Sequence, residues 1–394
     1  MKVKIRSIDD RRTDLFYTTR SVDIRPASKT IKTPIRALTN GDLNAKAGAP
    51  LDIPLNAPIA GIHFKLKTKD VQGIFSKNAT SNNLINKIEA FLQQMQHSDI
   101  VIPLIQPPST SFGDILEKEA DKRTFFRLIN QIQKFAGLST ICVPWLAFSR
   151  EKTVRFYDEI LQNSDDNFIF YLDADANPDD LEYILKFIKQ QIETERIQFV
   201  GILHQPVRKA LRSYDVVWES LKGSDVGIVL SDIERVDIHN PISAAYVSSS
   251  HLNEFIVGDV FMSRVSGGGG GKPSQTPVSH RLKIFNSKEL SVKPIEKYSD
   301  KDWIQNITQT IPDNTLSRKL ENYQEADIDQ EKYNILNYVT KVHEFILSSD
   351  EFVKSQEYIN KEESSVYIKQ KSALNVALSK ARNQKKLNGF FRVP

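Results

Sequence analysis

Carboxylates and histidines follow short apolar runs at several points between residues 140 and 262. The densest group is YLDADANPDDL, where Asp173 and Asp175 stand two positions apart. Alternate residues of a strand point to the same side, so this pair can bind a divalent cation or hold one proton between two carboxylates. The structural alternative places Asp173 inward and uses Asp179 or Asp180 as a helix-start charge that favours the N-terminal dipole.

Two further segments combine an acid or a histidine with arginines. His204 begins HQPVRKALR, in which Arg208 and Arg212 lie one helical turn apart. His204 can act as a proton donor while the arginines bind an anion; alternatively, it caps a turn and the arginines cover apolar surface with their stems. In VLSDIERVD, Asp232 follows an apolar run and Arg235 lies three residues on. That order suits a carboxylate nucleophile beside a cation and, equally, an aspartate that caps a turn.

The last apolar run, FIVGDVFMSR, repeats the order of acid then base. Asp259 and Arg264 belong either to a site or to a structural salt bridge, and His251 follows a serine run that binds anions or bends the chain. Three motifs are absent from the sequence: the HExxH zinc motif, the Gly-x-Ser-x-Gly nucleophile elbow and the GxGxxG dinucleotide fingerprint. A Rossmann dinucleotide site is therefore not expected.

The elements that must position these residues are short apolar segments rich in β-branched and aromatic residues: ICVPWLAF, FIFYLDADAN, FVGILHQPVRK, VGIVLSDIER, AAYVSSSH and FIVGDVFMSR. Such runs are typical of strands buried on both faces of a parallel sheet. The segments between them carry apolar residues at helical spacing, as in Leu181, Ile184, Leu185 and Ile188. This alternation predicts a (β/α)8 TIM-type barrel with a mainly helical C-terminal extension, and it places reactive side chains where strands end.

The rest of the chain is arranged around this predicted core. We expect an N-terminal strand and loop segment at 1–58, the barrel at 59–265, a glycine-rich linker or lid at 266–280, and a strand pair, helices and a basic tail at 281–394. Further strands are predicted at 59–66 and 99–105, and helices at about 83–96, 115–136 and 332–359.

Five consecutive glycines begin the linker and are followed by Lys272. The backbone of Gly267, Gly268 and Gly269 can approach a phosphate closely, so this segment is either a phosphate cradle or a flexible linker. The Walker pattern is missing, because no Gly-Lys-Ser/Thr opens a helix here.

The composition is that of a soluble intracellular protein, with 40% hydrophobic and 26% charged residues among 394. No apolar run is long enough to cross a bilayer, and the N-terminus lacks a signal-peptide core, so we expect a cytoplasmic protein without membrane contact. Cys142 is the single cysteine. It cannot form an internal disulfide or a cysteine-rich metal site, and no cofactor is expected.

The C-terminal end is uniformly basic, because no acidic residue follows Glu363. Such a block either neutralises nucleic-acid phosphates or forms a solvated tail. Its candidate phosphate contacts are Lys371, Lys380, Arg382, Lys385 and Lys386.

The order of these elements resembles that of the tRNA-guanine transglycosylases and their relatives that act on 7-deazaguanine in DNA. TIKTPIRALTN resembles the segment that precedes the family's barrel, HSDIVIPLIQPPS resembles its "SDI…PLD…T" strand, and ADKRTFFRLINQ resembles the following Arg-Thr helix. VGIVLSDIER resembles the strand that ends in the nucleophilic aspartate, so Asp232 is the counterpart. The helix with Val342-His343-Glu344 resembles the closing helix.

The resemblance implies base exchange at C1′ of a ribose or deoxyribose in tRNA or DNA. Asp232 would attack the sugar, and Asp173 would act as base or as a base-recognising acid. The chain departs from the family in lacking its zinc cysteines and a clear Asp-Ser-Gly-x-Phe-Gln motif, and Ile105-Gln106 stands where the family's second strand carries an acid.

Two other functions remain open from the residues alone. One is a barrel lyase or aldolase for a small phosphorylated substrate, using His204, Asp173 and the glycine run, although we expect no Schiff-base lysine at a strand end. The other is a non-catalytic barrel that binds nucleic acid or a protein. The sequence does not predict the oligomeric state.

Overall fold

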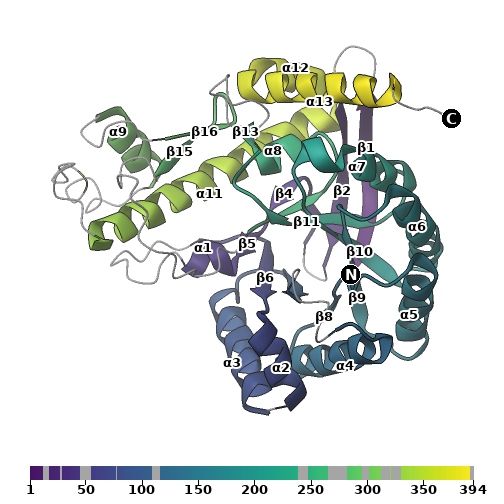
Figure 1. The fold of residues 1–394 in the computed structure, drawn as a ribbon. Coiled ribbons are helices and arrows are strands. Elements are labelled where there is room, and N and C mark those ends of the chain that lie inside the picture. Colours follow the sequence, from purple (N-terminus) through teal and green to yellow (C-terminus); the bar gives the residue numbers. More distant parts are fainter. Residues whose placement is uncertain are drawn as a thin grey trace.

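The computed structural model in Figure 1 describes residues 1–11, 17–26, 29–44, 55–76, 78–108, 116–237, 247–264, 282–294, 301–311, 320 and 330–390. Within these ranges, no helix is both long and apolar enough to cross a membrane. The predicted α/β class is confirmed, because parallel strands alternate along the chain with helices.

The parallel strands form two sheets. The larger has six strands in the spatial order β4 (Ile35–Arg36), β14 (Val260–Ser263), β11 (Gly227–Ile233), β10 (Ile197–Leu203), β9 (Asn167–Asp173) and β8 (Thr140–Val143). The smaller has the order β5 (Leu38–Thr39), β6 (Ile59–Lys65) and β7 (Ile100–Gln106). Only Ala37 separates β4 from β5, so one short segment belongs to both sheets.

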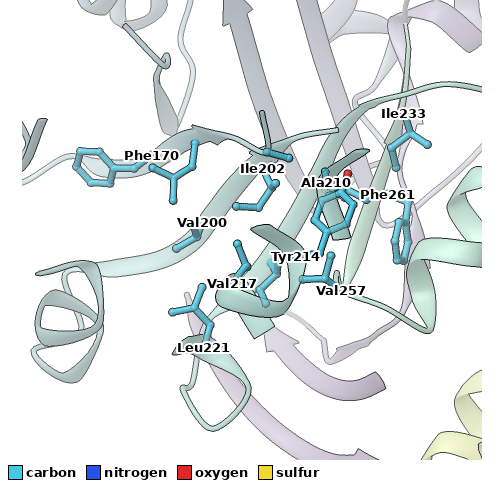
Figure 2. Packing of buried hydrophobic residues seen from close by; sticks show 14 of the residues in the cluster. Phe170, Val200, Ile202, Ala210, Tyr214, Val217, Leu221, Ile233, Val257 and Phe261 are labelled. Carbon is cyan, nitrogen blue, oxygen red and sulfur yellow. The ribbon is translucent and has the colours of Figure 1, made fainter. Parts of the chain in front are cut away.

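Helices follow the strands and cover one face: α2 (Thr68–Ser76), α3 (Asn78–Gln94), α4 (Glu119–Phe135), α5 (Arg150–Gln162), α6 (Pro178–Glu193) and α7 (Val207–Leu221). Figure 2 shows Ala210, Tyr214 and Val217 of α7 near Val200 and Ile202 of β10. Fully burying a large apolar side chain of this kind stabilises the fold by about 1.5–3 kcal/mol. The buried stripes of the helices therefore contribute much of the free energy that holds them on the sheet. The predicted stripe of α6 is buried in the same way.

Strand residues alternate between two cores except where the register shifts, as it does between Ile197 and Phe199 of β10. In β9, Ile169 and Tyr171 belong to an inner cluster, whereas Phe168, Phe170 and Leu172 belong to the cluster that includes the helices. Successive strand residues point to opposite faces, so this parity shows on which side any later residue of a strand should lie.

The other elements surround this core. An antiparallel sheet contains β1 (Lys2–Arg11), β2 (Tyr17–Arg25) and β3 (Ile31–Lys32), and another contains β12 (Val236–Asp237), β13 (Val247–Ser248), β16 (Ser291–Pro294) and β15 (Lys283–Asn286). The remaining helices are α1 (Asn40–Asn44), α8 (Ser249–Glu254), α9 (Lys301–Thr310), α11 (Gln330–Asn360), α12 (Ser364–Gln370) and α13 (Ser372–Phe390). Helix α11 includes the helix predicted at about 332–359, and its Ile335, Leu336, Val339 and Val342 are buried.

Two expectations about single segments are wrong. The run AAYVSSSH is not a strand of the parallel sheet, because its described part forms the two-residue β13 and then helix α8, which contains His251. Asp259 precedes β14 instead of ending it, so it lies at the amino end of the strand. There it forms a buried ion pair with Arg20, whose guanidinium also donates to carbonyl oxygens between Leu221 and Val226.

Candidate functional site

A cavity of about 510 Å³ lies at the carboxyl ends of the parallel strands. Its polar lining comes from both sheets and includes Lys65, Gln106, Asp173, His204, Asp232 and Arg264, which end or follow β6, β7, β9, β10, β11 and β14. Residues up to 199 positions apart, from Lys65 to Arg264, therefore meet in one place. The volume is within the usual range for a site that binds a small molecule or one unit of a polymer.

Asp232 reaches the cavity through an irregularity in its strand. Ile228 and Leu230 face the helices and Val229 faces the inner core, so regular alternation would turn Asp232 toward the helices. Instead, the register with β14 shifts between Leu230 and Ile233, and Asp232 has a φ of 63°. A left-handed non-glycine residue costs about 1–2 kcal/mol. This bulge redirects the carboxylate to the inner side, as bulges beside active sites do.

Two cations hold the Asp232 carboxylate in the cavity. The Lys65 ammonium lies 2.7 Å from Oδ1 and donates to Oδ2 at 2.8 Å. Arg264 donates from Nε to Oδ1 at 3.2 Å and from Nη2 to Oδ2 at 3.4 Å, and it also pairs with Glu234 at 2.6 Å. The carboxylate is therefore oriented by a bidentate arginine and a lysine, and its side chain is 9% exposed.

Asp173 also lines the cavity, but it is not paired there with Asp175. Burial raises the pKa of the Asp173 carboxyl, and the nearby Asp175 carboxylate raises it further. Asp173 Oδ1 accepts a hydrogen bond from the backbone N–H of Asp175 at 2.9 Å, so the chain turns here. Asp175 itself is exposed and does not line the cavity. The geometry therefore favours a single proton-holding acid over a metal-binding pair.

Two buried histidines lie at the site. Burial lowers the pKa of His204 to about 4, and nearby Arg264 lowers it further, so its imidazole is neutral at neutral pH. Burial likewise lowers the pKa of His63 to about 4, and its Nδ1 lies 4.0 Å from Oδ1 of Asp232. A neutral His204 cannot act as the protonated acid that the sequence analysis considered, although it can still donate one hydrogen bond.

The other predicted cations lie outside the cavity lining. Arg208 is exposed on α7, and Arg212 forms an exposed pair with Asp179 at 3.1 Å. Arg235 pairs with Glu344 of α11 at 2.5 Å and donates to the carbonyl of Lys283 at 2.7 Å. None of these arginines completes the site around His204 or Asp232.

His251 belongs to a buried cluster in another part of the fold. It contacts Glu254 at 3.2 Å and Ser348 at 3.0 Å, and its ring stacks on Phe352 with centroids 4.3 Å apart. Burial lowers the pKa of His251 to about 3. This histidine is a packed interior group and does not line the cavity.

Lys371 of the basic end is buried, which removes it from the predicted nucleic-acid contacts. Its ammonium donates to Glu351 at 2.5 Å and to the carbonyl of Ser287 at 2.8 Å. Lys380 is partly exposed on α13. The remaining predicted groups lie outside the described residues or side chains: Arg382, Lys385, Lys386, Gly267, Gly268, Gly269 and Lys272.

Sequence reasoning missed Lys65, Gln106 and His63 as site residues. The signal was strand parity, because Ile59 and Ile100 face the inner core and therefore so do Lys65 and Gln106 at the ends of the same strands. Lys65 also corrects the expectation that no lysine ends a strand.

The comparisons with known proteins assign no family. No protein-family model matches the chain, and a search of curated proteins finds no match. The zinc of the resembled family does not fit this chain, because Cys142 is buried within β8 and no cluster of three potential metal ligands occurs in the described ranges.

Proposed function

We propose that this chain is a transglycosylase-like enzyme that exchanges or modifies a guanine-type base in nucleic acid, with Asp232 as the nucleophile. The observation that carries the proposal is the bulge in β11, which turns this acid into the cavity. Backbone strain is retained at such a position when the reoriented side chain is used. The resemblance noted in the sequence assigns the same role to Asp232.

The proposal includes a closed (β/α)8 barrel built from both parallel sheets. On one side, Ile35 and Arg36 pair with β14, and the next strand pairs with β6. On the other side, the Tyr171 hydroxyl of β9 donates to the carbonyl of Pro103 of β7 at 3.0 Å, and the Ile105 N–H donates to Cys142 Sγ at 3.4 Å. These contacts support closure between β7 and β8, and the cavity then occupies the usual catalytic end.

The chemistry follows from the two acids. A carboxylate oxygen of Asp232 forms a bond to C1′ of the sugar while the glycosidic C1′–N bond breaks, and the base leaves with that electron pair. Asp173, whose pKa is raised by burial, supplies the proton to the departing base. The reverse steps bring in the new base. Asp173 accepts a proton from the incoming base, and a nitrogen of that base then displaces the Asp232 carboxylate from C1′.

Lys65 provides a way to free the nucleophile when substrate arrives. Its side chain is 38% exposed, whereas that of Asp232 is 9% exposed. A substrate phosphate can attract the flexible ammonium away from Asp232 and leave a carboxylate oxygen open for attack, while Arg264 keeps the carboxylate oriented. Nucleic acid would present its base by extrusion, because a cavity of about 510 Å³ has no room for a duplex.

A second group of charges supports a nucleic-acid partner. We call it the cation cluster, and it consists of Arg36, Arg235, Lys283, Lys341, Asp42 and Glu344. Burial lowers the pKa of both lysines, and nearby Arg235 lowers it further. Arg235 lies close enough to both lysines to lower their pKa, so these positive charges repel one another, and a phosphodiester would relieve this repulsion.

Covalent trapping tests the proposal. The unmodified chain should form a nucleic-acid adduct that survives denaturation when incubated with tRNA or with DNA and a competing base. Asp232→Asn should form no adduct and retain binding, whereas the control Asp179→Asn, an exposed acid outside the cavity lining, should form it normally. Failure of the unmodified chain to form an adduct with either nucleic acid rules out the nucleophile, and retained binding then favours a non-catalytic barrel.

Lys65 supports a second candidate, a lyase or aldolase for a small phosphorylated carbonyl compound. After passing a proton to Asp232, 2.7 Å away, the Lys65 amine can add to a carbonyl carbon, and the oxygen leaves as water to give an iminium ion. Borohydride reduction in the presence of glyceraldehyde 3-phosphate, followed by peptide mass measurement, should then label Lys65. Absence of that label removes this candidate and leaves the first unaffected.

A further inference from the structure

Asn253 of α8 does not line the cavity itself, but it contacts His204, which does. Its side chain is fully buried, and its Nδ2 lies 3.2 Å from Nε2 of His204. The same Nδ2 donates to the carbonyl oxygen of Ser249 at 2.8 Å. Neither Asn253 nor Ser249 has any place in the chemistry derived above, although burying an amide requires partners for it.

The Ser249 carbonyl determines which way the Asn253 amide points. Reversing the amide would bring its oxygen against this carbonyl oxygen and place two acceptors in contact, so the nitrogen must lie on this side. An amide nitrogen can only donate. Nε2 of His204 must therefore accept, and in a neutral imidazole the proton then lies on Nδ1.

The surroundings keep His204 neutral. Burial and the positive charge of Arg264 lower the pKa of the ring to about 4, against a smaller opposing effect of Asp232. Its Nδ1 has no hydrogen-bond partner among the described residues. This atom is covered by protein, so a ligand acceptor reaches it only when the neighbouring side chains move as the ligand binds.

We propose that Asn253 is a positioning residue that fixes His204 as a neutral Nδ1–H donor, so that the cavity selects a ligand with a hydrogen-bond acceptor at this point, such as a carbonyl oxygen. This inference deepens the proposed function, because it uses the same cavity. It assigns His204 to recognition and leaves proton transfer to Asp173.

Nitrogen-15 NMR of histidine-labelled full-length chain tests the tautomer directly. The resonances of His204, identified by their loss in His204→Gln, should show a protonated Nδ1 and an unprotonated Nε2 and should not titrate between pH 5 and 8. A protonated Nε2, or a titration midpoint near the usual 6.5, overturns the inference. This measurement needs no substrate, so its outcome is independent of whether the covalent adduct forms.

Two variants isolate the role of Asn253. Asn253→Ala removes the donor and should shift the ring toward the Nε2–H tautomer, and Asn253→Asp should raise the pKa of His204 through the adjacent negative charge. Asn130→Asp, which changes an amide between α4 and α5, is the control and should leave the His204 resonances unchanged. If adducts form, Asn253→Ala should slow their formation about tenfold and keep nucleic-acid affinity. Unchanged His204 resonances in both folded Asn253 variants refute the proposal.

Discussion

Replacing Arg20 with methionine should destabilise the fold more than any surface charge change on the same strand. Arg20 is 1% exposed on its side chain, and Asp259 is fully buried. Arg20 donates from Nε and Nη2 to the two carboxylate oxygens of Asp259 at 3.1 and 2.7 Å. It also donates from Nη1 to the carbonyl of Leu221 and from Nη2 to that of Val226, each at 2.6 Å. Methionine would fill part of the volume but satisfy none of these acceptors.

The magnitude follows from the charge left behind. Removing one partner of a buried ion pair costs about 3–5 kcal/mol, because the other charge stays buried without compensation. Asp259 would retain one donor, the N–H of Ile228 at 2.7 Å, so we expect a loss near the middle of that range. Arg25→Met is the matched control on β2. The Arg25 side chain is 53% exposed where it pairs with Asp23, and exposed pairs of this kind contribute about 0–1 kcal/mol.

Urea unfolding of both variants measures the difference. Relative to the unmodified chain, Arg20→Met should lower the free energy of unfolding by about 4 kcal/mol, and Arg25→Met should lower it by less than about 1 kcal/mol. The double variant Arg20→Met with Asp259→Asn should recover part of the loss, since it removes the uncompensated charge. Equal effects of Arg20→Met and Arg25→Met would refute the reasoning about burial.

Two further predictions concern protons and phosphates. The fold lowers the pKa of His251 to about 3, so the unfolded chain binds more protons than the folded chain between pH 6.5 and 3, and stability is lost as pH falls through that window. His251→Phe should therefore reduce the number of protons taken up on unfolding at pH 5 by about one. The control His97→Gln changes an exposed histidine and should leave the loss of stability on acidification in place. Lys283→Ala and Lys341→Ala should each make the plot of log affinity for duplex DNA against log salt concentration less steep by about 0.9. The control Lys186→Ala, which changes an exposed lysine, should leave the slope unchanged. Slopes of the two cluster variants equal to that of the unmodified chain would exclude the cation cluster as a phosphate contact.

Periodicity predicted the central parallel strands and several of the helices between them, because it reflects local packing requirements. The stripe of α6 and the strands β9, β10 and β11 appear where the apolar spacing placed them. The serine-rich segment around His251 did not follow, because Ser249 begins helix α8, which packs against β12, β13 and α13. Local propensity is a weak guide where a short segment is decided by its long-range neighbours.

The sequence by itself determined the α/β class and, within a regular strand, which residues share a face, since alternation is a property of the extended backbone. That rule also gives Lys65 and Gln106 their place in the cavity. Only the tertiary structure decided the orientation of Asp232 and the partner of Asp259. The first depends on a backbone irregularity against β14, and the second on an arginine 239 residues away, and neither leaves a local pattern in the amino-acid order.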